Sequence, residues 1–178
     1  MTLGQVIERT GMIIGVEGDS SQYPTQIANK LRDCVQTVYT ELITEHVPLR
    51  TKEKATLSGN RLYFEDLSYG VREILKISSD AGRLKFNVFS EYVEVEDGYS
   101  GEVEVEYLYY VCPETNADRL ILPPQFTEYI MAVGAAAEYF YRSSLIDEAL
   151  FFRNRFESGV NNLSRSGRVY SLPRRRLL

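Results

Sequence analysis

The stretch LILPPQFTEYIMAVGAAAEYFYRSSLIDEALFFRNRFESGVNNL, Leu120–Leu163, decides the fold of this chain. It predicts two antiparallel helices joined at Arg142–Leu145, because apolar residues recur at spacings of three and four in both halves. The stripe of the first helix is Phe126, Ile130, Val133, Ala137, Phe140 and Ser144, and that of the second is Leu145, Ala149, Phe152, Phe156, Val160 and Leu163. A proline suits a first helical turn, so Pro123-Pro124 is expected to open the first helix, and Ser144 is expected to cap the second.

The N-terminal part of the chain also carries helical periodicity. A short helix is expected over 2–10, with Thr2 as its cap, and Gly11, Gly15 and Gly18 are interpreted as breaking the pattern after it. A longer helix is expected over 24–45, where apolar residues keep a 3.6-residue period. Val47-Pro48 ends this helix, because the residue before a proline is disfavoured in the helical region.

Between about Leu49 and Val111 the period changes to two, which predicts an antiparallel sheet with one buried and one wet face. The expected strands are Arg61–Phe64, Val71–Ile77, Leu84–Val88, Tyr92–Glu96 and Gly101–Tyr107, with an Asp97-Gly98 turn between the last two. Because helices and strands are segregated along the chain, the expected fold class is α+β.

We therefore expect a helical bundle, made of the N-terminal helices and the C-terminal hairpin, with an inserted antiparallel β-rich subdomain and an extended tail. The expected parts are 1–48 for the N-terminal helices, 49–113 for the insert, 114–163 for the hairpin and 164–178 for the tail.

The charge of the chain is unevenly distributed. Residues 1–152 carry 13 Lys and Arg against 24 Asp and Glu, a balance of −11, whereas residues 153–178 carry seven Arg against one Glu, a balance of +6. A basic tail on an acidic body favours an acidic partner for the tail, which would bind by strand addition and arginine–carboxylate pairs; the alternative is an idle disordered terminus. The candidate docking residues are Arg168, Tyr170, Leu172, Arg174, Arg175, Arg176, Leu177 and Leu178.

No residue pattern in the sequence predicts catalysis. His46 is the only histidine, no serine or cysteine is marked as its nucleophile, and the glycines near position 15 do not follow a strand as a phosphate-binding loop requires. Cys34 and Cys112 are interpreted as small buried residues, and His46 as a helix-end charge. We expect a protein without catalytic activity, cofactor, metal or membrane span.

Glutamates and tyrosines suggest surfaces that meet other subunits. Glu94, Glu96, Glu102, Glu104 and Glu106 would form a ladder on the wet face of the last two strands. Opposed like charges are unfavourable, so either solvent with counterions or a basic neighbouring subunit must offset them. Tyrosine is enriched at interfaces, and it occupies more than one face of both a strand and a helix. The candidate interface or lumen residues are Glu102, Glu104, Glu106, Tyr129 and Tyr139.

Three short motifs resemble the head-to-tail connector (adaptor) proteins of tailed bacteriophages. They are Tyr109-Tyr110-Val111-Cys112-Pro113, then Leu122-Pro123-Pro124-Gln125-Phe126, then Ala135-Ala136-Ala137-Glu138-Tyr139-Phe140 with Asp147-Glu148-Ala149. The first motif ends the strand-rich insert, which itself follows a helix, and the other motifs belong to the two-helix hairpin. The resemblance spans roughly 24–163, although the long insert departs from the smallest, mostly helical members.

The resemblance implies a structural virion protein of the neck, made in the host cytoplasm and located between the capsid portal and the tail. Such proteins form a ring, typically twelvefold, that docks beneath the portal, extends the DNA channel and provides a platform for a downstream tail or neck protein. Genomic DNA passes through the lumen without sequence-specific binding. In this family the C-terminal segment often reaches the portal, and here that segment would be 164–178 with Arg174, Arg175 and Arg176 as contacts.

Three other functions remain open from the sequence. The chain could form a different phage neck or tail ring, such as a tail-completion protein, although such rings usually rely on sheets. It could be a small nucleic-acid-binding module that uses the basic tail. It could also be an enzyme of unrecognised type, which would require a pocket with convergent polar groups.

Overall fold

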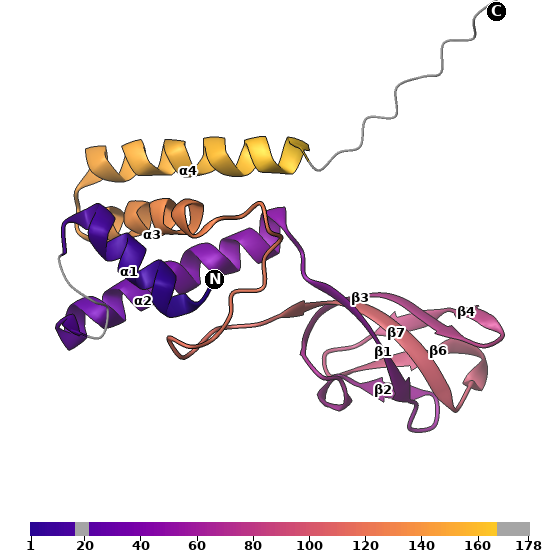
Figure 1. The fold of residues 1–178 in the computed structure, drawn as a ribbon. Helices are drawn as coiled ribbons and strands as arrows, with labels where there is room; N and C mark the ends of the chain where they lie inside the picture. The colour runs from indigo at the N-terminus through magenta and orange to yellow at the C-terminus, as the bar shows by residue number, and fades with distance from the viewer. Residues whose placement is uncertain (17–21, 167–178) are drawn as a thin grey trace, which may run out of the picture. The chain divides into compact units, whose positions relative to one another are not determined.

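A computed structural model describes residues 1–16 and 22–166 and confirms the α+β fold (Figure 1). Contacts within the chain divide it into two compact units. The helical unit comprises Met1–His46 and the described part of Pro113–Leu178, and the β unit comprises Val47–Cys112. The boundaries expected for the insert, 49 and 113, lie close to these.

The helical unit is built around one buried helix. Its helices are α1 (Leu3–Ile14), α2 (Thr25–Glu41) with its π-helical extension η2 (Leu42–His46), α3 (Glu128–Arg142) and α4 (Ile146–Ser166). Helix α3 contacts α1, α2 and α4, and Figure 1 shows α4 running along α3 on the side away from α1 and α2. The middle of α3 is buried on all sides: Met131, Ala132, Val133, Gly134, Ala135, Ala136 and Ala137.

Small side chains allow α3 to occupy this central position. A Cβ added to Gly134 would lie 2.8 Å from Phe156 Cδ2 of α4 and 2.8 Å from Val38 Cγ1 of α2. Both distances are shorter than an ordinary van der Waals contact, so a glycine is required for α2 and α4 to pack this closely. The predicted hairpin stripe is buried at its centre, where Phe156 and Val160 are each 1% exposed.

The structure corrects the predicted ends of three helices. Helix α1 runs through Gly11 to Ile14, because Gly11 gives room to the ring of Tyr23 rather than breaking the helix. Helix α3 begins at Glu128, after the prolines. Ser144 does not cap α4: it has a left-handed φ of 59°, and Leu145 separates it from the first residue of the helix. The Thr2 cap is confirmed, since its side chain accepts a hydrogen bond from the Gln5 N–H.

The β unit contains two antiparallel sheets in the described residues. The strands are β1 (Arg50–Thr56), β2 (Arg61–Tyr63), β3 (Gly70–Ser79), β4 (Gly82–Leu84), β5 (Phe86–Val88), β6 (Tyr92–Val95) and β7 (Glu102–Tyr110). One sheet has the order β1-β7-β3-β4 and the other the order β2-β6-β5. The aliphatic core of this unit includes Leu62 and Val93 of the second sheet and Ile77 and Val105 of the first, each fully buried.

Three strand predictions were wrong or incomplete. Leu84–Val88 is not one strand, because β4 pairs with β3 and β5 pairs with β6 in the other sheet. Strands β6 and β7 flank Asp97-Gly98 in sequence but do not pair, and they belong to different sheets. Strand β1 was not predicted as a strand of its own.

Candidate assembly surfaces

Large apolar side chains are exposed at the turn of the α3–α4 hairpin. Tyr141, Leu145, Ile146, Leu150 and Phe151 have relative exposures between 45% and 66%. They lie within eleven consecutive positions, whereas the core-facing residues Ala149 and Phe156 of the same helix are buried. Contiguous exposed apolar surface of this kind marks an interaction site more often than single exposed residues do.

A hollow of about 320 Å³ extends from this surface along one flank of α4. We call it the α2-side groove, and its apolar lining includes Val38 of α2, Gly134 and Ala137 of α3, and Ile146 and Leu150 of α4. Leu150 and Ile146 are half exposed here, so the groove offers apolar area to a partner side chain.

Arg153 forms the polar edge of the α2-side groove. Its guanidinium donates to both carboxylate oxygens of Glu41, at 2.8 and 2.6 Å, and its Nε donates to Glu157 at 2.7 Å. The pKa of Arg153 is raised, chiefly by its hydrogen bond to Glu41. A two-pronged arginine–carboxylate pair fixes geometry as well as charge, so this ion pair holds α4 in place against α2.

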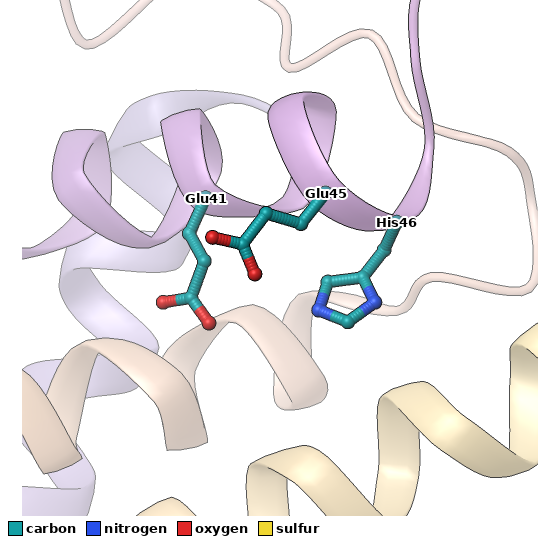
Figure 2. Close-up of side chains that lie close together, drawn as sticks. All are labelled: Glu41, Glu45 and His46. Carbon is teal, nitrogen blue, oxygen red and sulfur yellow. The ribbon is translucent and has the colours of Figure 1, made fainter.

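An acidic cluster lies beside this ion pair. The side chains of Glu41, Glu45 and His46 converge at the end of α2 and η2, with one potential ligand atom of each within 4.8 Å of the others (Figure 2). Both oxygens of Glu41 already accept hydrogen bonds from Arg153, and Glu45 and His46 are exposed. The chemistry of the donor set therefore does not favour a metal, and the cluster is better described as a negative surface.

The opposite flank of α4 is basic and aromatic. The guanidinium carbons of Arg9 (α1) and Arg155 (α4) lie 5.9 and 5.3 Å from the ring centroid of Tyr129 (α3). Beside the ring is a hollow of about 220 Å³ lined by Ile130, Val133, Phe156 and Gly159. We call Arg9, Tyr129 and Arg155 the α1-side clamp.

Neither arginine of the α1-side clamp forms a salt bridge with any residue in the described ranges. Of the three clamp residues, only Tyr129 was predicted from the sequence. The sequence does distinguish these two arginines from others in the helices. Neither Arg9 nor Arg155 has an acidic residue three or four positions away, whereas Arg142 pairs with Glu138 and Arg153 with Glu157 at a spacing of four.

Tyr139 lies on α3, away from the clamp, with its ring 4.4 Å from the Lys30 ammonium nitrogen. It also makes an edge contact with Phe140 at a centroid distance of 5.9 Å. Tyr139 is half buried, and most of its surface is therefore used within the helical unit.

The predicted glutamate ladder is wrong in its composition and in its explanation. Only Glu102, Glu104 and Glu106 share a strand; Glu94 lies on β6 in the other sheet, and Glu96 lies in a short 3₁₀ turn. Basic side chains of the same subunit neutralise these carboxylates. On β1, Arg50 contacts Glu106, Lys52 lies 3.9 Å from Glu104 and Glu106, and Lys54 lies 2.7 Å from Glu102. On β2, Arg61 lies 3.2 Å from Glu94. Basic groups of the same subunit, which the sequence analysis did not consider, thus offset these charges.

A hydrogen-bonded cluster in the β unit was missed because its members are far apart in sequence. Glu53 accepts from the Ser68 N–H at 2.9 Å, from the Ser68 hydroxyl at 2.5 Å and from the Tyr107 hydroxyl at 2.8 Å. Burial alone would raise the pKa of Glu53, but the hydrogen bonds from Ser68 and Tyr107 outweigh it and lower that pKa. Burial, followed by the nearby Glu53 carboxylate, raises the pKa of Tyr107, which therefore stays a donor.

The two cysteines differ in their environments. Cys34 is buried in α2, as expected, and burial raises the pKa of its thiol to about 11. Cys112 is exposed, contrary to the sequence interpretation, because β7 ends at Tyr110 and Cys112 lies beyond the sheet.

The predicted docking residues of the tail, from Arg168 to Leu178, lie outside the described residues.

None of the helices in the described part of the chain is both long and apolar enough to cross a lipid bilayer. No protein-family model matches the chain, and no curated protein matches it either.

Proposed function

We propose that this chain is a head-to-tail connector of a tailed bacteriophage, a structural protein that forms a ring beneath the portal, extends the DNA channel and supports the tail. The observation that carries the proposal is the exposed apolar surface at the hairpin turn, from Tyr141 to Phe151. Large apolar side chains that are exposed close together mark interaction sites, and burial against a neighbouring subunit would remove them from water.

The helical unit suits the subunit contacts of a ring better than the β unit does. The charged groups of the β1–β7 pair are already neutralised within the subunit, as for Lys54 with Glu102. In the helical unit, five large apolar side chains are exposed within eleven positions at the hairpin turn, and two arginines lack a carboxylate partner among the described residues. A ring formed by helices favours the connector over a tail-tube type of ring, in which sheets usually make the contacts.

The net charge of the body is compatible with a DNA channel. Residues 1–152 carry a balance of −11, and duplex DNA is repelled by a surface of the same sign. A lumen lined by this body would let DNA pass without holding it. The basic tail would then serve a protein contact rather than DNA binding.

The test is to mix the full chain with a candidate portal protein and to image the product by electron microscopy. We expect a ring of this chain stacked on the portal ring. Failure to associate, combined with salt-sensitive binding of the chain to short duplex DNA that is lost without 164–178, would support the nucleic-acid-binding module instead.

Two tail variants refine the test. Deleting Arg174–Leu178 is expected to abolish portal association while leaving the melting temperature unchanged. Changing Arg174, Arg175 and Arg176 together to lysine keeps the charge but removes the forked guanidinium, so a partial loss indicates carboxylate pairing on the portal. Full portal binding by the deletion variant contradicts tail docking.

A further inference from the structure

Two surfaces of the helical unit have opposite charge and lie on opposite flanks of the same helix. Arg153 borders the α2-side groove and Arg155 belongs to the α1-side clamp. Two residues that are two positions apart on an α-helix are rotated by about 200° around the helix axis, so the side chains of Arg153 and Arg155 leave α4 in nearly opposite directions. The two surfaces therefore cannot meet within one subunit.

The α1-side clamp carries positive charge that its own subunit does not neutralise. Arg9 and Arg155 are within cation–π distance of Tyr129, and neither forms a salt bridge with a residue of the described ranges. Tyr129 is 37% exposed, and a hollow of about 220 Å³ adjoins it. Tyrosine and arginine beside an apolar hollow are the composition of an interface hot spot.

The α2-side groove carries an excess of negative charge. Its charged lining residues are Glu138 and Arg153. Glu138 pairs with Arg142, Arg153 pairs with Glu41 and Glu157, and Glu45 lies beside Glu41, so these linked groups are four carboxylates against two guanidinium groups. Glu45 is exposed and forms no salt bridge in the part of the chain that the structure describes. Its carboxylate lies beside that of Glu41, so a further cation at this position would relieve repulsion between like charges (Figure 2).

We propose that the α1-side clamp of one subunit docks on the α2-side groove of a second copy of this chain. Arg9 and Arg155 of one copy then face Glu41 and Glu45 of the next, and Tyr129 covers the exposed part of Leu150. The charge complementarity of the two surfaces identifies the occupant as a second copy. A contact between two different surfaces on opposite flanks leaves both free for further copies, and it produces a ring when the rotation closes.

This inference rests on the proposed function and names the contact that would hold the ring together. Rim charges mainly set orientation and association rate, while the apolar centre supplies most of the affinity. The contact should therefore weaken at high ionic strength without vanishing, because salt screens exposed ion pairs but not apolar burial.

Charge reversal in the full-length chain tests the contact. We expect Arg155→Glu and Glu45→Arg each to weaken self-association at least about tenfold, measured by sedimentation velocity, and the double variant to recover wild-type association. Arg83→Glu is the matched control, because Arg83 is exposed on β4 and should leave association unchanged. Thermal melting by circular dichroism verifies that each variant is folded.

The same variants are measured alone and with the portal protein, where the readout is the number of chains bound per portal. Wild-type assembly that neither reversal weakens, or that the double variant fails to restore, overturns this contact and leaves the connector function standing. A chain that stays monomeric under both conditions overturns the contact and the connector function together.

Discussion

Gly134 offers the sharpest test of how closely the helices pack. Changing it to alanine places a Cβ 2.8 Å from Phe156 Cδ2 and 2.8 Å from Val38 Cγ1. Overpacking of this kind costs about 1–3 kcal/mol, and the better helix propensity of alanine returns up to about 1 kcal/mol. We expect Gly134→Ala to lower the free energy of unfolding by about 1 kcal/mol.

A second substitution shows whether the crowding is the cause. Phe156 is 1% exposed, so Phe156→Leu leaves a cavity, and its cost should fall below the roughly 3–5 kcal/mol of a full truncation to alanine. The cavity lies where the methyl group introduced by Gly134→Ala would go. The double variant should therefore be more stable than the sum of the two single effects by about 0.5–2 kcal/mol.

Urea unfolding followed by circular dichroism measures all four proteins of this cycle. A coupling free energy of the expected sign indicates that α4 contacts α3 through Phe156 at position 134. Additivity within about 0.5 kcal/mol would refute the close approach of these two helices, because uncoupled sites behave in that way.

Three further predictions concern single groups in both units. Cys34 is buried with its pKa raised to about 11, whereas Cys112 is exposed. Only Cys112 should therefore react with iodoacetamide in the native protein at pH 8, and both thiols should react in urea. Rapid labelling of both thiols in the native protein would contradict the packing of α2. Because folding lowers the pKa of Glu53, its carboxylate stabilises the folded state at pH values above its ordinary pKa of 4.5. This stabilisation is lost as the pH falls through the lower pKa of the folded state. Glu53→Gln should therefore reduce the stability difference between pH 7 and pH 3, measured by urea unfolding, whereas the exposed control Glu91→Gln should preserve it. Gly15 ends α1 with a φ of 81°, so Gly15→Ala should cost about 1 kcal/mol by thermal unfolding, and no loss would argue against this cap.

The helical part of the fold was largely readable from sequence because its signal is local. Apolar spacing identified the stripe through Phe156 and Val160, and the Thr2 cap lies next to the groups that it binds. The helix ends were less accurate. The sequence does not distinguish a glycine that ends a helix from one, such as Gly11, that makes room for a neighbouring ring inside a helix; only the tertiary contact shows which role the glycine has.

The β unit and the assembly surfaces were harder to predict because their partners are distant in sequence. Strand β1 carries mostly polar residues, so its alternation was not recognised, and the lysines that neutralise Glu102 and Glu104 went unassigned. The α1-side clamp draws one residue from each of three helices. The missing acidic neighbour of each arginine is a local signal, but its meaning depends on packing that the sequence alone does not give.

The most direct measurement of the central claim is the particle mass by light scattering, for the full chain alone and with a portal protein. The account predicts a multiple of the 20.4 kDa chain mass under at least one of these conditions. We also expect a loss of that assembly in Leu150→Ser, which places a polar group within the exposed apolar surface. A mass of 20.4 kDa for the wild-type chain under both conditions would contradict the proposal that this protein is a ring-forming connector.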